Sequence, residues 1–265
     1  MDINKYFKLL SEHKLDEARE TRMATIPEKL IKFVWLNDDD SDEKRFTSLK
    51  NNEIWFSHKR YLNDPYEFKG MLVDRAKFVE AGYPEDVIDK YQTLFEFDDY
   101  GITCLSANEI DYLPMWAYYT NNHKGFCIEY EVIKKDCIYE VLYEPERIKV
   151  ASLLFQCKEA VRKAIQGSDK KQADIYSAIF LQNLFIKAKA WEHEKEYRIV
   201  YPIGAKKGEN IPAYMLGMKV SRIVAGINCS EKNIERLDKI SNSLDLGNAY
   251  KSCIHPEKYT IEVVR

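Results

Sequence analysis

The spacing of apolar and polar positions along the chain predicts a mixture of strands and helices. Short runs rich in β-branched and aromatic residues are typical of buried strands, and apolar residues that recur every three or four positions are typical of amphipathic helices. We predict strands over residues 29–36, 53–57, 100–106, 126–130, 137–145, 194–201, 211–213, 220–226 and 259–264. We predict helices up to about residue 25 and over residues 46–52, 74–97, 112–120, 148–165, 171–191 and 230–244.

This order of elements predicts an α+β fold with a mixed, largely antiparallel sheet flanked by helices. Residues 1–25 form a helical lead-in at the N-terminus. Residues 26–265 form a single domain, because no repeat, low-complexity segment or shift in composition divides them.

The composition limits the class of protein. Of the 265 residues, 45% are hydrophobic and 31% are charged, which fits a globular domain with a sizeable core. The net charge of -3 provides no general electrostatic footprint for nucleic acid. We expect a cytoplasmic protein without membrane contact, because neither a signal-peptide pattern nor a bilayer-spanning apolar run occurs. The 6 cysteines show no CxxC spacing, so we expect reduced thiols.

The densest chemistry lies in the stretch from Trp191 to Tyr201, where the predicted helix runs into a predicted strand. With a period of two, Glu194, Glu196 and Arg198 share one face of that strand. An unpaired buried charge costs several kcal/mol, so a strand that buries this face must pair its charges. The stretch is therefore either a structural ion pair or a functional site in which Arg198 orients Glu196.

A second group of polar side chains follows the strand at residues 53–57. The group consists of Ser57, His58, Asn63, Asp64, Tyr66 and Glu67. The Asn-Asp-Pro triplet predicts a turn, since Pro fixes φ and the Asn and Asp side chains bond to the turn backbone. Loops held by a rigid strand are also where ligands bind, so we expect these residues to contact a ligand. A plain turn is the simpler alternative.

The predicted helix 112–120 and the turn after it supply Trp116, Tyr119 and His123. Trp116 and Tyr119 lie on one helix face, where their rings either stack on a ligand or belong to the core. His123 is either a ligand contact or an ordinary turn residue.

Several kinds of site are excluded by their missing motifs. The chain has no Gly-x-Ser-x-Gly elbow, no P-loop and no Gly-x-Gly-x-x-Gly. The possible metal ligands are His58, Asp64, Glu67, His123, His193 and Glu194. None of them has the spacing of a recognised metal motif, so we expect no metal.

Four ordered motifs resemble the bacterial family catalogued as domain of unknown function 2971. They are residues 54–57 with 63–67, residues 104–106, residues 115–119 with 123–128, and residues 191–198. The resemblance runs from about Phe33 to Gly226, and the family itself implies no activity.

A more distant resemblance is to the ADP-ribosyltransferase fold with its split sheet. In that superfamily, a His or Arg on the first strand, a Tyr or Ser on a middle strand and a Glu on a late strand form the NAD site. The resemblance implies Glu196 as the catalytic carboxylate and either Ser106 or Tyr119 as the middle residue. Its first-strand position falls near Lys32 or Phe33.

The resemblance leads us to expect an NAD-consuming, ADP-ribosyltransferase-like toxin or phage-defence effector that modifies a nucleic acid or a protein. Trp116 and Tyr119 would then stack on NAD. One alternative is a non-catalytic ligand-sensing or protein-interaction domain of a bacterial defence or toxin–antitoxin system, with a partner protein. A second alternative is a metal-dependent hydrolase or nuclease.

Overall fold

The computed structural model describes residues 2–12, 14–93, 95–151, 154–155 and 181–265. The strands are β1 (Lys29–Val34), β2 (Glu53–His58), β3 (Met71–Val73), β4 (Tyr100–Ser106), β5 (Phe126–Val132), β6 (Tyr139–Glu140), β7 (Leu142–Glu144), β8 (Ile148–Val150), β9 (Ile186–Ala188), β10 (Glu196–Pro202), β11 (Gly208–Pro212), β12 (Met218–Ala225), β13 (Tyr250–Ile254) and β14 (Ile261–Val264). The α-helices are α1 (Ile3–Ser11), α2 (Leu15–Met23), α3 (Glu43–Lys50), α4 (Arg75–Glu80), α5 (Glu85–Thr93), α6 (Leu113–Tyr119) and α9 (Glu231–Ser243). The 3-10 helices are η1 (Asp40–Asp42), η2 (Lys59–Tyr61), η3 (Gln182–Phe185), η4 (Lys189–Glu194) and η5 (Ala213–Leu216).

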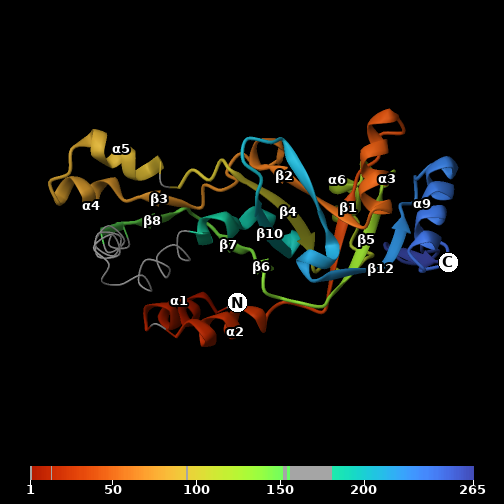
Figure 1. Cartoon of the computed structure of the whole chain (residues 1–265), viewed down its shortest axis with the longest axis horizontal. Helices are drawn as coiled ribbons and strands as arrows, with labels where there is room; N and C mark the ends of the chain where they lie inside the picture. The colour runs from red at the N-terminus through yellow and green to blue at the C-terminus, as the bar shows by residue number, and fades with distance from the viewer. Residues whose placement is uncertain (1, 13, 94, 152–153, 156–180) are drawn as a thin grey trace.

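A sheet of ten strands forms the centre of the molecule (Figure 1). Eight strands follow one another in the order β11-β2-β4-β1-β5-β12-β13-β14, and β10 pairs with both β4 and β6. All pairings in this sheet are antiparallel except that of β12 with β13. The predicted α+β class and the largely antiparallel sheet are confirmed.

The edge of β4 that faces away from β10 is shared by two strands. β10 pairs with β4 along its whole length, from Glu196 opposite Ser106 to Pro202 opposite Tyr100. On the other edge, β2 pairs at Gly101 and Ile102, and β1 pairs only at Ser106. The strands β1 and β2 therefore meet β4 at opposite ends.

The two faces of the sheet bury different cores, because successive strand residues point to opposite sides. Leu30 belongs to the large core with residues of α3 and α9. The next residue, Ile31, packs with Trp116 of α6 on the other face. A separate core surrounds Phe78, where α4 and α5 cover the parallel pair β3 and β8. Figure 1 shows this part at one end of the molecule and α9 at the other.

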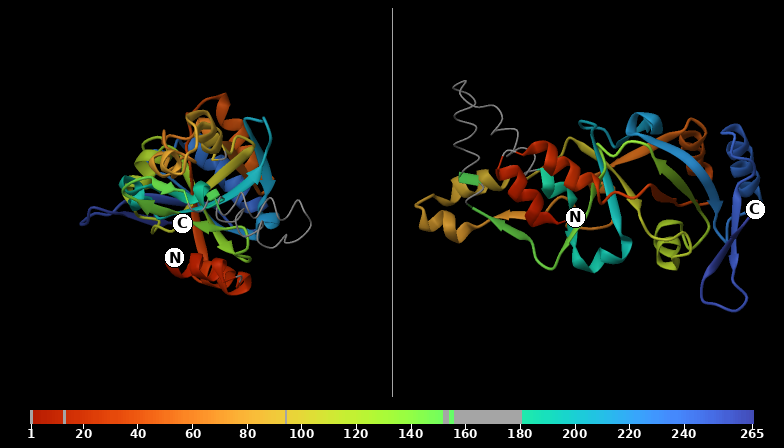
Figure 2. Two further views of the ribbon diagram at one scale, coloured as in Figure 1. Left: turned by 90° about the vertical axis from the view of Figure 1, so that its left-hand side faces the viewer. Right: turned by 90° about the horizontal axis from the view of Figure 1, so that it is seen from below.

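The predicted helical lead-in is confirmed as two short helices, α1 and α2, which we call the N-terminal hairpin. Figures 1 and 2 show it on the outside of the molecule, beside β6 and away from the rest of the large sheet. None of the described helices combines the length and the apolar character that a membrane-spanning helix needs.

Two helix predictions are wrong where the structure describes them. Ile148–Val150 is the strand β8. Within the predicted helix 171–191, residues from Gln182 onward form η3, the short strand β9 and the first half of η4. Every residue from 182 to 187 is buried, and a segment buried on all sides shows no hydrophobic period that distinguishes helix from strand. The remainder of both predicted helices lies almost entirely outside the described residues.

Candidate functional site

Strand β10 places Glu196 and Arg198 side by side on a buried face, as predicted from the period of two. Glu196 is 3% exposed and Arg198 is fully buried. Arg198 donates from Nε to Glu196 Oε1 at 2.7 Å and from Nη2 to Glu196 Oε2 at 3.1 Å. Arg198 also donates to the carbonyl of Leu184 at 2.8 Å. The two residues form a bidentate ion pair inside the protein.

Three further buried charges join this pair. Arg198 Nη2 donates to Glu67 Oε1 at 2.7 Å. Lys187 Nζ donates to Glu196 Oε2 at 2.9 Å and also to Glu194 Oε2. All five side chains are less than a tenth exposed. We call Glu67, Lys187, Glu194, Glu196 and Arg198 the charge network.

Glu194 belongs to the network, but it lies on a different element from the one predicted. The predicted strand began at Glu194, but β10 begins at Glu196 and Glu194 ends η4. Lys195 between them is left-handed, with φ 45° and ψ 53°, so the chain turns there and both carboxylates face Lys187. Ser106 fixes this turn by donating to the carbonyl of Glu194 at 2.7 Å.

Tyr119 connects the network to the protein surface. Its hydroxyl donates to Glu194 Oε1, and it accepts from the exposed Asn63 Nδ2 at 3.3 Å. A second tyrosine, Tyr143, accepts from the backbone N–H of Glu196 at 2.8 Å. Glu194 and Glu196 are therefore each held by a tyrosine as well as by a cation.

The loop at residues 63–67, which we call the 63–67 loop, carries two acceptor oxygens that lack donors. Asp64 Oδ1 accepts from the N–H of Tyr66 at 2.8 Å. Asp64 Oδ2 and Glu67 Oε2 are buried and have no hydrogen-bond partner among the described residues. Asp64 is 5% exposed and Glu67 is 7% exposed.

The charges of the network shift one another's protonation. Burial opposes the ionisation of Glu196, but Arg198 and Lys187 outweigh it and lower the pKa of Glu196 to about 2. Burial raises the pKa of Glu67 despite the nearby Arg198. The pKa of Lys187 is raised, because the attraction of Glu196 and Glu194 exceeds the cost of burial. With every group ionised, the network has one more negative than positive charge.

Lys32 lies beside the network on the first strand of the sheet. Its Nζ donates to Thr103 Oγ1 at 2.7 Å. Burial lowers the pKa of Lys32, and the charge of Glu196 partly offsets this effect. The other first-strand residue implied by the resemblance, Phe33, instead packs edge-on against Trp116, with ring centroids 5.4 Å apart.

Four predicted ligand contacts lie apart from the network. Ser57 pairs within the sheet opposite Gly208 and Ile102. His58 caps η2, accepting from the N–H of Arg60 at 3.2 Å. Trp116 is fully buried in the core under α6, and the ring of His123 stacks parallel to it at 6.3 Å.

The remaining predicted residues lie in or around the charge network. Asn63, Glu67, Tyr119, Glu194, Glu196 and Arg198 come together, with Ser106 holding the turn behind them, while Asp64 and the exposed Tyr66 bond to each other within the 63–67 loop. Two cavities in the described part of the chain, of about 310 and 260 Å³, are lined by other residues. In the same part of the chain, no three His, Cys, Asp or Glu side chains converge as a metal ion requires.

Sequence reasoning missed Lys187 and Tyr143. Lys187 is a single charge in the apolar run from Leu184 to Ala188, and an isolated charge in such a run signals a buried ion pair. Tyr143 had no comparable signal, because its role depends on the fold bringing β7 beside the start of β10.

Residues 115–199 match the family model described as Protein of unknown function (DUF2971). The matched segment covers less than half of the chain and holds Tyr119, Lys187, Glu194, Glu196 and Arg198. No curated protein and no solved structure matches the chain significantly. The match supports the resemblance over this segment, and the family description assigns no activity to it.

Proposed function

We propose that this chain is a non-catalytic ligand-binding domain in which the 63–67 loop and Tyr119 meet the ligand. The proposal rests on a difference in hydrogen bonding among the buried carboxylates. Both oxygens of Glu196 are bonded within the charge network, whereas Asp64 Oδ2 and Glu67 Oε2 lack donors. A buried acceptor left unpaired costs about 1–3 kcal/mol, so a ligand that brings N–H or O–H donors recovers that energy.

Two residues of the 63–67 loop, Asn63 and Tyr66, are exposed and would contact the ligand first. Tyr66 is 56% exposed, and Asn63 ties the loop to α6 through the 3.3 Å bond with Tyr119. A ligand that replaces Asn63 would donate to the Tyr119 hydroxyl, which itself donates to Glu194. Such a ligand is small and polar and carries several donors.

Thermal unfolding of the full chain with a panel of small molecules tests this proposal. The panel contains NAD, nicotinamide, adenosine, guanosine, the basic amino acids and spermidine. A ligand present at 100 times its dissociation constant adds about 2.7 kcal/mol of stability, which raises Tm by several degrees. If no compound raises Tm, the proposal fails.

The variant Asp64→Asn locates the site, because it retains the Oδ1 acceptor for Tyr66 and turns the unpaired oxygen into a donor. Asp39→Asn is the matched control, since Asp39 accepts from the N–H of Ser41 at 2.8 Å in a different turn. We expect the ligand-induced rise in Tm to disappear in Asp64→Asn and to persist in Asp39→Asn. An equal rise in both variants would place the ligand elsewhere.

A second candidate function is NAD consumption with Glu196 as the catalytic carboxylate. The observation in its favour is the pairing of β10 with β4, which sets Glu196 opposite Ser106, the late-strand Glu and the middle-strand Ser that the resemblance implies. An ionised carboxylate stabilises the oxocarbenium-like state formed when nicotinamide leaves, and the acceptor would be a nucleic acid or a protein in a toxin or phage-defence setting. Because Glu196 is 3% exposed, this function requires the network to open.

Nicotinamide release measured with NAD and cell extract tests the second candidate. We expect release by the wild-type chain and its loss in Glu196→Gln. The absence of release, or equal release by the two proteins, would remove this candidate and leave the ligand-binding proposal intact.

A further inference from the structure

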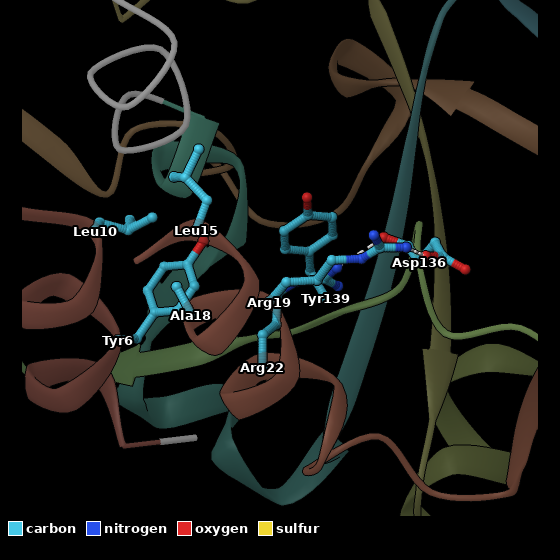
Figure 3. Close-up of a pocket in the computed structure, with 8 residues that line it drawn as sticks. All are labelled: Tyr6, Leu10, Leu15, Ala18, Arg19, Arg22, Asp136 and Tyr139. Carbon is cyan, nitrogen blue, oxygen red and sulfur yellow. Dashed lines mark hydrogen bonds and ion pairs between the residues drawn. The ribbon is translucent and has the colours of Figure 1, made fainter. Parts of the chain in front are cut away.

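A cavity of about 310 Å³ lies between the N-terminal hairpin and the segment that leads into β6 (Figure 3). Tyr6 and Leu10 line it from α1, and Leu15 and Arg22 line it from α2. Its volume is at the lower end of the range for small-molecule sites. No residue of the charge network lines it.

Arg22 brings a positive charge to this cavity without a matching negative charge. Its side chain is 4% exposed and donates to the carbonyls of Asp136 at 2.8 Å, Lys135 at 3.5 Å and Ile138. The guanidinium also lies 4.1 Å from the ring centroid of Tyr139. All of these partners are uncharged, and none of the ion pairs among the described residues includes Arg22.

A buried cation of this kind favours an anion. Burying a charge without a counter-charge costs several kcal/mol, and an incoming carboxylate offsets part of that cost. A guanidinium has five N–H donors, of which the three carbonyl contacts of Arg22 use three. Two donors therefore remain for a ligand.

The rim of the cavity supplies a second cation. Arg19 pairs there with Asp136, and the two side chains are 56% and 49% exposed. Exposed ion pairs contribute little to stability, so Arg19 can exchange Asp136 for a ligand carboxylate at small cost. The lining thus holds two arginines and one carboxylate, which leaves a positive charge.

Apolar side chains form the remaining wall. Leu10, Leu15 and Ala18 line the cavity, and Figure 3 shows them on the side away from Asp136. A wall of this kind buries a hydrocarbon or aromatic body, while the arginines bind the acid group.

We propose that this cavity binds a small aromatic carboxylate, with the acid group toward Arg19 and Arg22 and the ring against Leu10 and Leu15. The site is separate from the 63–67 loop and does not depend on the function proposed there. The ligand contacts both helices of the hairpin and the segment before β6, so it fastens the hairpin to the sheet.

Isothermal titration of the full chain with three probes tests this assignment. Benzoate has both the ring and the charge, benzamide has the ring without the charge, and acetate has the charge without the ring. We expect benzoate to bind at least tenfold more tightly than either of the other two. Equal affinity for benzamide would refute anion recognition, and equal affinity for acetate would refute the apolar wall. The absence of benzoate binding would overturn the proposal as a whole.

Two variants locate the site. Arg19→Gln removes the rim cation from an exposed position and should weaken benzoate binding about tenfold. Ala18→Leu fills the cavity and should abolish binding while leaving the circular dichroism spectrum unchanged. Arg75→Gln is the control, because Arg75 is a similarly exposed arginine whose partners are Glu85 and Asp89 on α5. If benzoate binds Arg19→Gln and Arg75→Gln equally well, the site lies elsewhere and the proposal fails.

Discussion

Replacement of Arg198 by methionine tests whether the charge network is one energetic unit. Arg198 is fully buried and makes four hydrogen bonds, two to Glu196, one to Glu67 and one to the Leu184 carbonyl. Methionine has a similar length and no charge. Arg198→Met therefore leaves Glu67 and Glu196 to pair with Lys187, whose Nζ lies 4.0 Å from Glu67 Oε1 and 2.9 Å from Glu196 Oε2.

The expected loss follows from these contacts. Removal of one partner from a buried ion pair costs about 3–5 kcal/mol, because the charge that remains is not compensated. A domain of ordinary stability unfolds with about 5–15 kcal/mol, so Arg198→Met removes a large part of that energy. The double variant Glu196→Leu with Arg198→Met removes one charge of each sign and keeps the net charge of the network. We expect the double variant to lie within about 2 kcal/mol of wild type.

Urea unfolding at pH 7, followed by circular dichroism, gives the free energies of the wild type, Arg198→Met, Glu196→Leu and the double variant. Arg236→Met is the control, because Arg236 pairs with Glu43 at 2.8 Å and is 26% exposed, so its loss should cost less than about 1 kcal/mol. The reasoning is refuted if Arg198→Met costs no more than this control. It is also refuted if the double variant loses as much as the two single variants combined.

Three further predictions concern individual members of the site. The pKa of Glu196 is lowered from 4.5 to about 2, so its contribution to stability is present above pH 4.5 and is lost as the pH falls toward 2. The pKa of Glu67 is raised, so the contribution of Glu67 to stability decreases as the pH rises. Glu196→Gln should therefore flatten the acid limb of the stability curve measured by urea unfolding between pH 5 and 2, and an unchanged slope would contradict this. Tyr119→Phe should cost about 1–3 kcal/mol in the same assay, since Glu194 Oε1 loses its tyrosine donor, whereas Tyr118→Phe on the exposed helix face should be neutral. Lys195→Gly should stabilise the chain by about 0.5–1 kcal/mol, because glycine adopts the left-handed backbone at φ 45° without steric cost, and a loss of stability would count against it.

Local patterns predicted much of the fold and one ion pair of the site. The strand at residues 100–106 and the period of two through Glu196 and Arg198 required only the sequence, since a buried strand must pair its charges. The loop with Asn63 was also identifiable, because its turn residues follow a strand directly.

Long-range contacts set the rest of the site, and no local pattern encodes them. Glu67 meets Arg198 across 131 positions of sequence, and Tyr119 meets Glu194 across 75. The turn at Lys195 was missed because lysine carries no preference for a left-handed backbone. Trp116 shows the opposite error, since an aromatic side chain that looked suitable for stacking on a ligand is a core residue.

The match to the family model covers four of the five members of the charge network. Lys187, Glu194, Glu196 and Arg198 lie inside the matched segment 115–199, and Glu67 lies outside it. If the buried charges are one unit, a chain that loses the cation at position 198 must also lose a carboxylate at position 196, because a single uncompensated charge costs about 3–5 kcal/mol.

We therefore expect the charges at these four positions to change together among chains that match the same model. The position of Glu67 should vary more freely, because the network without Glu67 still holds two carboxylates and two cations. An alignment of such chains measures whether the four charges change together and how freely position 67 varies. Independent change at positions 196 and 198 would mean that the network is not a unit, and strict retention of Glu67 would mean that its role lies in the network and not in ligand choice.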